Sequence, residues 1–159
     1  MARIYIAVGG NLGDPLQTVR DAIQTLQNHS ALTAVTASSC YRSKPMGPQD
    51  QPDYVNAVVA ADTELSPIDV LDTLQAIEQE FGRQRQRRWG ERTLDLDLLL
   101  YANLIYQDAR LTLPHPGVEV RDFVVIPLYE LTPTLTLPNG KRLHDCLASI
   151  ADHDLQKIN

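Results

Sequence analysis

The sequence predicts an α+β fold, in which an antiparallel sheet of four strands carries two helices on one face. Four short segments are alternating or rich in β-branched residues, and two longer segments carry apolar residues at helical spacing behind a capping residue and a proline. Their order is strand, helix, strand, strand, helix, strand, which is the ferredoxin-like βαββαβ arrangement. A chain of 159 residues is long enough for a core of its own, so we expect a single domain over residues 1–159.

The first part of the chain supplies a strand, a helix and a second strand. Residues 3–8 alternate and predict the first strand, and the glycine-rich residues 9–13 predict a tight loop. Asp14 is placed to cap a helix whose first position is Pro15. The apolar stripe of this helix is Leu16, Val19, Ile23 and Leu26. Residues 32–41, small and β-branched, predict the second strand.

A proline-rich loop separates the second strand from the third. Residues 43–54 contain three prolines and a glycine, and long loops in compact domains are usually functional. Residues 56–62 predict the third strand. Ser66 then caps a helix that has Pro67 at its first position and ends at Gly82. The buried face of this helix is expected to be Val70, Leu71, Leu74, Ile77 and Phe81.

The fourth strand, residues 94–101, is followed by additions beyond the βαββαβ core. From residue 104 the sequence predicts a His-Pro loop, a short helix near residues 118–125 and a C-terminal hairpin. Pro-Asn-Gly at residues 138–140 marks the turn of that hairpin. We therefore expect a C-terminal helix and hairpin added to the core.

Composition and charge narrow the classes of function. No apolar run reaches membrane-spanning length, and the alternating N-terminus predicts a strand and not a signal peptide. Cys40 and Cys146 are too few for a disulfide framework, which favours a cytoplasmic location. The net charge of −6 disfavours general nucleic-acid binding, whereas one basic loop in an acidic chain suits a small anion. We expect small-molecule substrates, no nucleic-acid or membrane partner, and a monomer.

A basic segment followed by two aspartates carries most of the chemical information. Residues 83–92 contain five of the eleven arginines and one acid, so their local charge is +5 − 1 = +4. Arginine makes planar, bidentate contacts to phosphate and stays charged when desolvated. Asp95 and Asp97 point to the same side of a strand with Cα atoms roughly 6.5 Å apart, so both carboxylates reach one hard cation or a close pair. Mg²⁺ suits this pair, because it takes one or two carboxylates together with waters and phosphate oxygens.

Three neighbouring features refine this interpretation. The core-facing row of the fourth strand is expected to be Leu94, Leu96, Leu98 and Leu100. Leu99 and Tyr101 would continue the aspartate row, so that face is polar only where the strand begins. Trp89 has no apolar periodicity around it, which favours a loop residue that covers a planar ligand. Gly9 and Gly10 match no phosphate-binding glycine motif, so a tight strand-to-helix turn is favoured there.

Five motifs spread over most of the chain resemble those of one enzyme family. They are Gly-Gly-Asn-Leu-Gly-Asp at 9–14, Tyr-Arg-Ser-Lys-Pro at 41–45, Gly-Pro-Gln-Asp-Gln-Pro-Asp-Tyr-Val-Asn at 47–56, Arg-Trp-Gly-Glu-Arg-Thr-Leu-Asp-Leu-Asp at 88–97 and Leu-Pro-His-Pro at 113–116. In this order they are similar to the 6-hydroxymethyl-7,8-dihydropterin pyrophosphokinases of folate biosynthesis. The segment Arg-Thr-Leu-Asp-Leu-Asp is highly specific to that family.

The resemblance implies a reaction, a cofactor and a set of polar residues. Members of the family transfer the β,γ-pyrophosphoryl unit of ATP to the hydroxymethyl oxygen of the pterin, and AMP leaves. ATP would be the co-substrate, and Asp95 and Asp97 would hold two Mg²⁺ ions. The implied catalytic residues are Arg83, Arg92, Asp95 and Asp97. The implied nucleotide-binding residues are Gln75, Glu78, Arg85, Arg88, Trp89, Arg92, Arg110, Thr112, His115 and Arg121. Which arginine contacts which phosphate stays open.

The resemblance also implies a pterin site. Its residues would be Ser43, Pro45, Met46, Tyr54, Asn56, Trp89 and Phe123. Aromatic rings can sandwich the pterin, and the amide of Asn56 offers both a donor and an acceptor to its polar edge. Trp89 would act as a lid when loops 43–54 and 83–92 close. On residue type alone, His115 also fits a structural His-Pro turn, Phe123 a core position and Asn56 a strand edge.

Three other functions compete with this interpretation. An RNA-binding module can use the same βαββαβ order, but it needs aromatic and basic residues exposed on its central strands, and these strands lack that signature. A non-catalytic protein would bind ATP or metal without turnover. An ordinary kinase would act on the γ-phosphate and release ADP in place of AMP.

Overall fold

The structure, a computed structural model, describes residues 1–44, 53–82 and 94–158. Its elements in chain order are β1 (Ala2–Gly10), α1 (Pro15–Gln27), β2 (Leu32–Ala37), β3 (Tyr41–Ser43), β4 (Tyr54–Thr63), α2 (Pro67–Glu80), β5 (Asp95–Tyr101), β6 (Tyr106–Gln107), β7 (Thr112–Leu113), α3 (Asp122–Leu131), α4 (Leu143–Cys146), the 3-10 turn η1 (Leu147–Ile150) and β8 (Gln156–Lys157). The predicted βαββαβ order is confirmed once β2 and β3 are counted as two halves of the second strand.

The main sheet is antiparallel and has β1 and β4 at its centre. β5 lies on the outer side of β1, and both β2 and β3 pair with the outer side of β4. β8 extends the sheet by pairing with β3. The predicted strand over residues 32–41 is interrupted at 38–40, because Ser38 bonds to Val58 of β4 through both its backbone and its side chain. Val58 O accepts from Ser38 N at 2.8 Å, and Val58 N donates to Ser38 Oγ at 2.9 Å.

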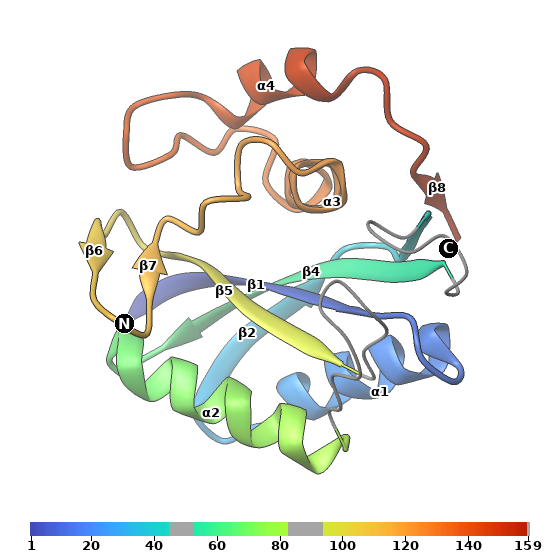
Figure 1. Cartoon of the computed structure of the whole chain (residues 1–159). Helices are drawn as coiled ribbons and strands as arrows, with labels where there is room; N and C mark the ends of the chain where they lie inside the picture. The colour runs from blue at the N-terminus through green and yellow to red at the C-terminus, as the bar shows by residue number, and fades with distance from the viewer. Residues whose placement is uncertain (45–52, 83–93, 159) are drawn as a thin grey trace.

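Helices cover both faces of the sheet (Figure 1). α1 and α2 lie on one face, and α3 and α4 lie on the other. The first core lies on the side of α1 and α2 and includes Ile4 of β1, Val19 of α1 and Leu74 of α2. The second core lies on the side of α3 and includes Val58 of β4 and Leu128 of α3. The C-terminal additions therefore form a third layer on the face that the ferredoxin-like core leaves open.

The predicted starts of both long helices are confirmed. Asp14 Oδ1 accepts a hydrogen bond from the backbone of Gln17 at 3.3 Å, and Ser66 Oγ accepts one from Asp69 at 3.2 Å. A proline follows each cap, where the missing N–H removes no helical hydrogen bond. Gly82 follows α2 with a φ of 69°, the left-handed conformation expected of a glycine that ends a helix.

β5 contains a β-bulge that the alternating pattern did not predict. Leu99 is the extra residue of the bulge in the pairing of β5 with β1, so the side chains that follow it point to the opposite faces of the sheet from those predicted. Leu100 joins Leu99 in the second core, while Tyr101 packs against the first. The predicted rows are therefore wrong for Leu100 and Tyr101. Asp95 and Asp97 precede the bulge and pair with Gly9 and Ala7 of β1, so they share a face.

The C-terminal elements differ from the prediction in their bounds. The helix predicted near residues 118–125 begins only at Asp122, because residues 116–120 form turns, and it continues past Pro127 to Leu131. Pro127 lies inside α3, where it has no N–H to donate to the carbonyl of Phe123 four residues earlier. The turn at 138–140 is confirmed, but its hairpin is reduced to one bridge between Thr136 and Arg142. The β6–β7 hairpin and β8 were not predicted.

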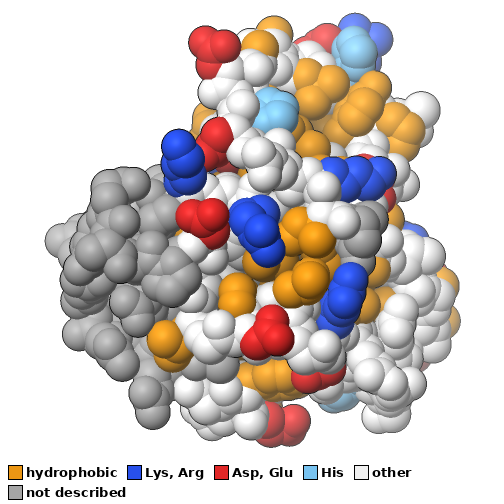
Figure 2. Space-filling view, turned by 90° about the vertical axis from the view of Figure 1, so that its right-hand side faces the viewer, with side chains coloured by type: hydrophobic (Ala, Val, Ile, Leu, Met, Phe, Trp, Pro, Cys, Tyr) orange, Lys and Arg blue, Asp and Glu red, His pale blue; other side chains and the backbone are white. Residues whose placement is uncertain are grey.

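The surface carries charges of both signs. On the side where β8 lies, Lys and Arg side chains are interspersed with Asp and Glu and surround a group of hydrophobic side chains (Figure 2). This described surface thus has no continuous field of one sign. In the parts of the chain that the structure describes, no helix combines the length and apolar content needed to cross a membrane.

Candidate active site

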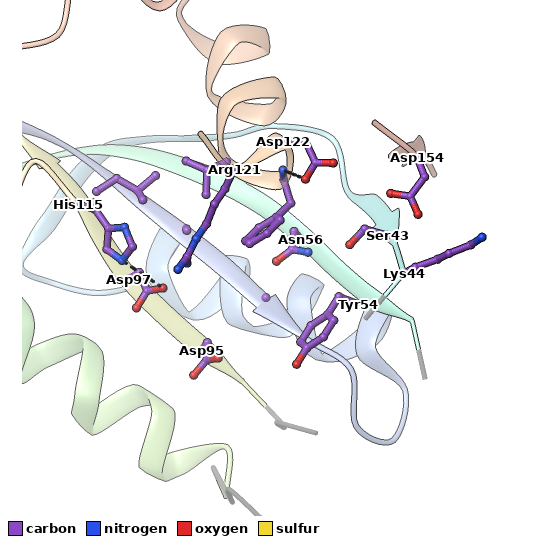
Figure 3. Close-up of a pocket in the computed structure, with 15 residues that line it drawn as sticks. Ser43, Lys44, Tyr54, Asn56, Asp95, Asp97, His115, Arg121, Asp122 and Asp154 are labelled. Atoms are coloured by element: carbon purple, nitrogen blue, oxygen red, sulfur yellow. Dashed lines mark hydrogen bonds and ion pairs between the residues drawn. The ribbon is translucent and has the colours of Figure 1, made fainter. Parts of the chain in front are cut away.

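A pocket of about 300 Å³ opens between the sheet and the start of α3. Its lining residues come from β1, β3–β5, the turn before α3, α3 itself and the segment before β8. They are Ala7, Gly9, Ser43, Lys44, Tyr54, Asn56, Asp95, Asp97, Leu99, His115, Arg121, Asp122, Phe123, Val124 and Asp154. His115, Arg121 and Asp97 lie toward one end of this first pocket and Ser43, Lys44 and Asp154 toward the other, with Asn56 between them (Figure 3).

Strand register places the aspartates and Asn56 on the same face of the sheet. Gly9 of β1 pairs with Asn56 of β4 on one side and with Asp95 of β5 on the other. A Cβ atom at position 9 would lie only 2.2 Å from Asn56 Oδ1, so the glycine leaves the space that the amide occupies. Gly9 and Gly10 were predicted in a tight turn, but β1 continues through both of them. Asn56 lies in the interior of the sheet, so it is not a strand-edge residue.

A buried carboxylate fixes the backbone between the two aspartates. Glu78 of α2 is 7% exposed, and its Oε2 accepts a hydrogen bond from Leu96 N at 2.7 Å. The other side of β5 is held by β1, so the backbone at Leu96 is fixed from two directions. Sequence reasoning assigned Glu78 to the nucleotide; the structure places this carboxylate oxygen on the strand that carries Asp95 and Asp97.

The aspartate pair has the chemistry of a hard-cation site. Asp97 is 49% exposed and therefore accessible from the pocket. Within the described ranges, no group of three or more His, Cys, Asp or Glu side chains is arranged to hold a metal ion. Two carboxylates fit Mg²⁺ if other oxygen atoms complete its coordination, and phosphate oxygens are the usual source. The pair thus fits a metal that binds together with a phosphorylated ligand.

His115 is held with its Nε2 atom toward Asp97. Its backbone N–H donates to Leu99 O at 2.9 Å, the carbonyl of the bulged residue, and its Nδ1 accepts from Gly117 N at 3.0 Å. A neutral ring therefore carries its proton on Nε2, which lies 3.9 Å from Asp97 Oδ2. Burial lowers the pKa of His115 below its ordinary value, Asp97 opposes this shift, and Arg121 adds to it.

Arg121 reaches the first pocket across a glycine. A Cβ atom at position 117 would lie 2.6 Å from Arg121 Cδ, so Gly117 leaves room for the arginine side chain. The Arg121 guanidinium carbon lies 5.8 Å from the ring centroid of Phe123, within the range of a cation–π contact. Phe123 also packs against the second core, so its ring has both a structural contact and a place in the pocket wall.

A second pocket, of about 260 Å³, lies beside β5. It is lined by Leu71, Leu96, Asp97, Leu98, Arg110, Leu111, Thr112, His115 and Pro116. Asp97 and His115 line both pockets, so the two cavities meet at these residues. The remaining wall is largely apolar, with hydroxyl and guanidinium groups from the β6–β7 hairpin. This composition suits the flat, partly polar face of a nucleobase.

Comparison with known proteins identifies the family. Residues 5–133 match the family model described as 7,8-dihydro-6-hydroxymethylpterin-pyrophosphokinase (HPPK). The chain belongs to the HPPK family. It is 52% identical over its whole length to the 2-amino-4-hydroxy-6-hydroxymethyldihydropteridine pyrophosphokinase of Haemophilus influenzae, of which it covers 99%. The Pseudomonas aeruginosa protein of the same name is 43% identical over 98% of this chain and 96% of its own length. The predicted family resemblance is confirmed.

Solved structures support the HPPK fold. The crystal structure described as HPPK-DHPS in complex with substrates has a TM-score of 0.72 and 12% sequence identity, and the match covers 94% of this chain and 45% of that one. A Plasmodium falciparum HPPK-DHPS with pteroate also has a TM-score of 0.72, at 11% identity. At such low identity the similarity shows the fold alone. This chain spans less than half the length of those proteins.

The structure brings together part of the HPPK site predicted from the sequence. Ser43, Tyr54, Asn56 and Phe123 line the first pocket, Arg110 and Thr112 line the second, and Gln75 contacts Arg110. The remaining predicted residues, Pro45, Met46, Arg83, Arg85, Arg88, Trp89 and Arg92, lie outside the described residues, as do most of the two loops expected to close.

Sequence reasoning missed several residues of the two pockets. Asp122 and Asp154 line the first pocket, and Leu71 and Leu98 line the second. Leu71 was assigned only to a buried helix face, and Leu98 only to the core row. Asp154 has no local signal, because its position depends on the pairing of β8 with β3.

Proposed function

We propose that this chain transfers the β,γ-pyrophosphoryl group of ATP to the hydroxymethyl oxygen of 6-hydroxymethyl-7,8-dihydropterin, with release of AMP, in folate biosynthesis. The observation that carries this proposal is that two pockets of similar volume meet at Asp97 and His115. Two substrates bound in them would present their reactive ends to each other at that junction. Membership of the HPPK family supports the identity of both substrates and of the reaction.

The first pocket is the proposed pterin site. Tyr54 and Phe123 supply aromatic surface for a planar ring, and Asn56 supplies one donor and one acceptor at mid-pocket. Ser43 lies at the end away from Asp97 (Figure 3). A pterin whose pyrimidine edge meets Asn56 and Ser43 would direct its hydroxymethyl group toward the aspartates.

The second pocket is the proposed nucleoside site. Leu71 and Leu98 offer apolar surface to the base, while Thr112 and Arg110 offer hydrogen-bond donors. From there the triphosphate would extend toward Asp97, His115 and Arg121. Arg121 carries a permanent positive charge, and His115 presents Nε2–H, so both can donate to phosphate oxygens.

The proposed reaction is an in-line transfer between the two bound substrates. The hydroxymethyl oxygen loses its proton to the solvent and forms a bond to the β-phosphorus. The bond from that phosphorus to the oxygen bridging it to the α-phosphate breaks, and AMP leaves with that oxygen. Positioning and charge neutralisation supply most of the rate enhancement in such transfers. No general base is assigned; Asp97 is a candidate, although a carboxylate bound to a metal is a weak base.

Mg²⁺ is part of the proposal, and two ions are expected. Asp95 and Asp97 would hold it, because they lie on one face of β5 and both line the first pocket. When bound, Mg²⁺ neutralises charge on phosphate oxygens and makes a coordinated hydroxyl easier to deprotonate. A monomeric state and a cytoplasmic location complete the proposal, since ATP and small substrates require no membrane or protein partner.

Nucleotide product analysis tests the function directly. Purified protein is incubated with Mg²⁺, ATP and 6-hydroxymethyl-7,8-dihydropterin, and the nucleotides are separated by chromatography. AMP formed only when the pterin is present, in equal amount to the pterin diphosphate, is the expected result. ADP would indicate transfer of the γ-phosphate, and ATP binding without turnover would indicate a non-catalytic protein.

A further inference from the structure

An ion pair on the outer side of the second pocket connects α2 to the β6–β7 hairpin. Arg110 Nη2 donates to Asp72 Oδ1 at 2.6 Å and to Gln75 Oε1 at 3.1 Å. Asp72 and Gln75 are three residues apart on α2, so their side chains lie on the same face of the helix. Arg110 lines the pocket beside Leu71, the neighbour of Asp72. The three polar side chains therefore lie next to the proposed nucleoside site.

The backbone of Arg110 is fixed independently of its side chain. Asp108 Oδ1 accepts hydrogen bonds from Arg110 N and Leu111 N, each at 2.8 Å, and Asp108 Oδ2 accepts one from the Tyr106 hydroxyl. The hydrogen bond from Tyr106 and that from the Arg110 backbone hold the pKa of Asp108 below its ordinary value. Asp108 thus fixes the backbone position of Arg110, and Asp72 fixes the position of its guanidinium.

We propose that Asp72 is a positioning residue for nucleotide binding, which holds the Arg110 guanidinium against the second pocket. This inference rests on the proposed function, which places ATP in that pocket. Both hydrogen bonds to α2 use Nη2, so they leave the donors of Nη1 and Nε for contacts with the nucleotide. Asp72 and Arg110 are 55% and 46% exposed at their side chains, so without the carboxylate this long side chain would sample other rotamers in solvent.

The charge of Asp72 makes the proposal easy to test. An acid beside a binding site for a polyanion repels the ligand. If Asp72 acted only through its charge, neutralising it would therefore tighten ATP binding. Loss of a positioning contact has the opposite effect and weakens ATP binding. The sign of the change therefore separates the two roles.

Asp72→Asn is the informative variant, and Asp69→Asn is its matched control. Asp69 lies one turn earlier on α2, is exposed and carries the same charge, so its replacement changes the net charge equally. For Asp72→Asn we expect a rise of roughly three- to fivefold in the KM for ATP, because an exposed ion pair makes a modest contribution. The KM for the pterin and kcat should stay within twofold of wild type. Asp72→Glu, which restores a carboxylate, should recover most of the loss.

A double-mutant cycle shows whether Asp72 acts through Arg110. In an Arg110→Ala background, Asp72→Asn should cause no further rise in the KM for ATP. The same set of variants is titrated at equilibrium with a non-hydrolysable ATP analogue and Mg²⁺. An unchanged or lower KM for Asp72→Asn, or an equal rise in the Arg110→Ala background, overturns the positioning role. Wild-type protein that binds the analogue but forms no AMP contradicts the proposed function while leaving the role of Asp72 measurable by binding.

Discussion

Replacement of Gly9 by alanine tests how the sheet prepares the pterin site. The new Cβ atom would lie 2.2 Å from Asn56 Oδ1 and 3.3 Å from Asn56 Cγ. Ordinary contact begins at 3.4 Å, so the amide oxygen must move by about 3.4 − 2.2 = 1.2 Å. A shift of that size breaks the hydrogen bonds proposed between the amide and the pterin. Two such bonds of about 1 kcal/mol each correspond to a rise of about 30-fold in the KM for the pterin.

The assay is steady-state kinetics with each substrate varied in turn. The KM for ATP should change little in Gly9→Ala, because the second pocket contains neither Gly9 nor Asn56. Thermal unfolding should show a loss of about 1–3 kcal/mol, as is typical of overpacking. In an Asn56→Ser background the shorter side chain removes the clash, so Gly9→Ala should then cost little stability. An unchanged KM for the pterin in folded Gly9→Ala protein would refute the reasoning.

Three further changes test the aspartates, the acid behind them and the attachment of α3. Asp97→Ala should abolish nearly all turnover and leave the melting temperature unchanged, because the half-exposed carboxylate is a proposed metal ligand and not a core group. Glu78→Ala should cost about 1–3 kcal/mol of stability and also lower kcat, because it leaves Leu96 N–H without this acceptor. Glu78→Gln keeps an oxygen acceptor and should lose less stability. Glu130 of α3 accepts hydrogen bonds from Tyr41 and Ser39, which outweigh the effect of burial and hold its pKa below the ordinary value of 4.5. Its stabilisation is therefore present above pH 4.5 and is lost as the pH falls through the folded-state pKa, so the difference in melting temperature between wild type and Glu130→Gln should narrow in acid.

Clear outcomes would contradict each of these expectations. Wild-type rates in Asp97→Ala would remove Asp97 from the metal site. A Glu78→Ala protein with normal stability would mean that solvent satisfies Leu96 N–H. A difference in melting temperature between wild type and Glu130→Gln that stays constant from pH 7 to acid would show that the carboxylate charge contributes nothing there.

The core of the fold was predictable because local signals and burial agree. Asp14 and Ser66 cap helices, and the rows of apolar residues on both helices face the first core. The bulge at Leu99 was not predictable from alternation, since a β-bulge changes which side chains face the core without changing their composition. The break at Ser38 depends on its hydrogen bonds to a strand 20 residues away.

The candidate site was predictable to the extent that its residues stand in motifs. The motifs contain Ser43, Tyr54, Asn56, His115 and both aspartates, and all of these line a pocket. Asp72 and Asp154 stand outside any motif. They could not be predicted, because their proximity to the site depends on packing between distant segments. The sequence shows a glycine at position 9 but not why the position needs one. The need for space beside Asn56 becomes clear only from the pairing of β1 with β4.

The pairing of β8 with β3 has a consequence for the order in which parts of the molecule fold and locally unfold. Tyr41 and its partner Lys157 are 157 − 41 = 116 residues apart, so this contact closes a very long loop. Non-local contacts of this kind form late in folding, and a two-residue edge strand is among the first elements to exchange its amide hydrogens. Hydrogen exchange should therefore be faster at Lys157 than in β1 or β4. The outer wall of the first pocket would open in such fluctuations while the aspartate strand stays folded.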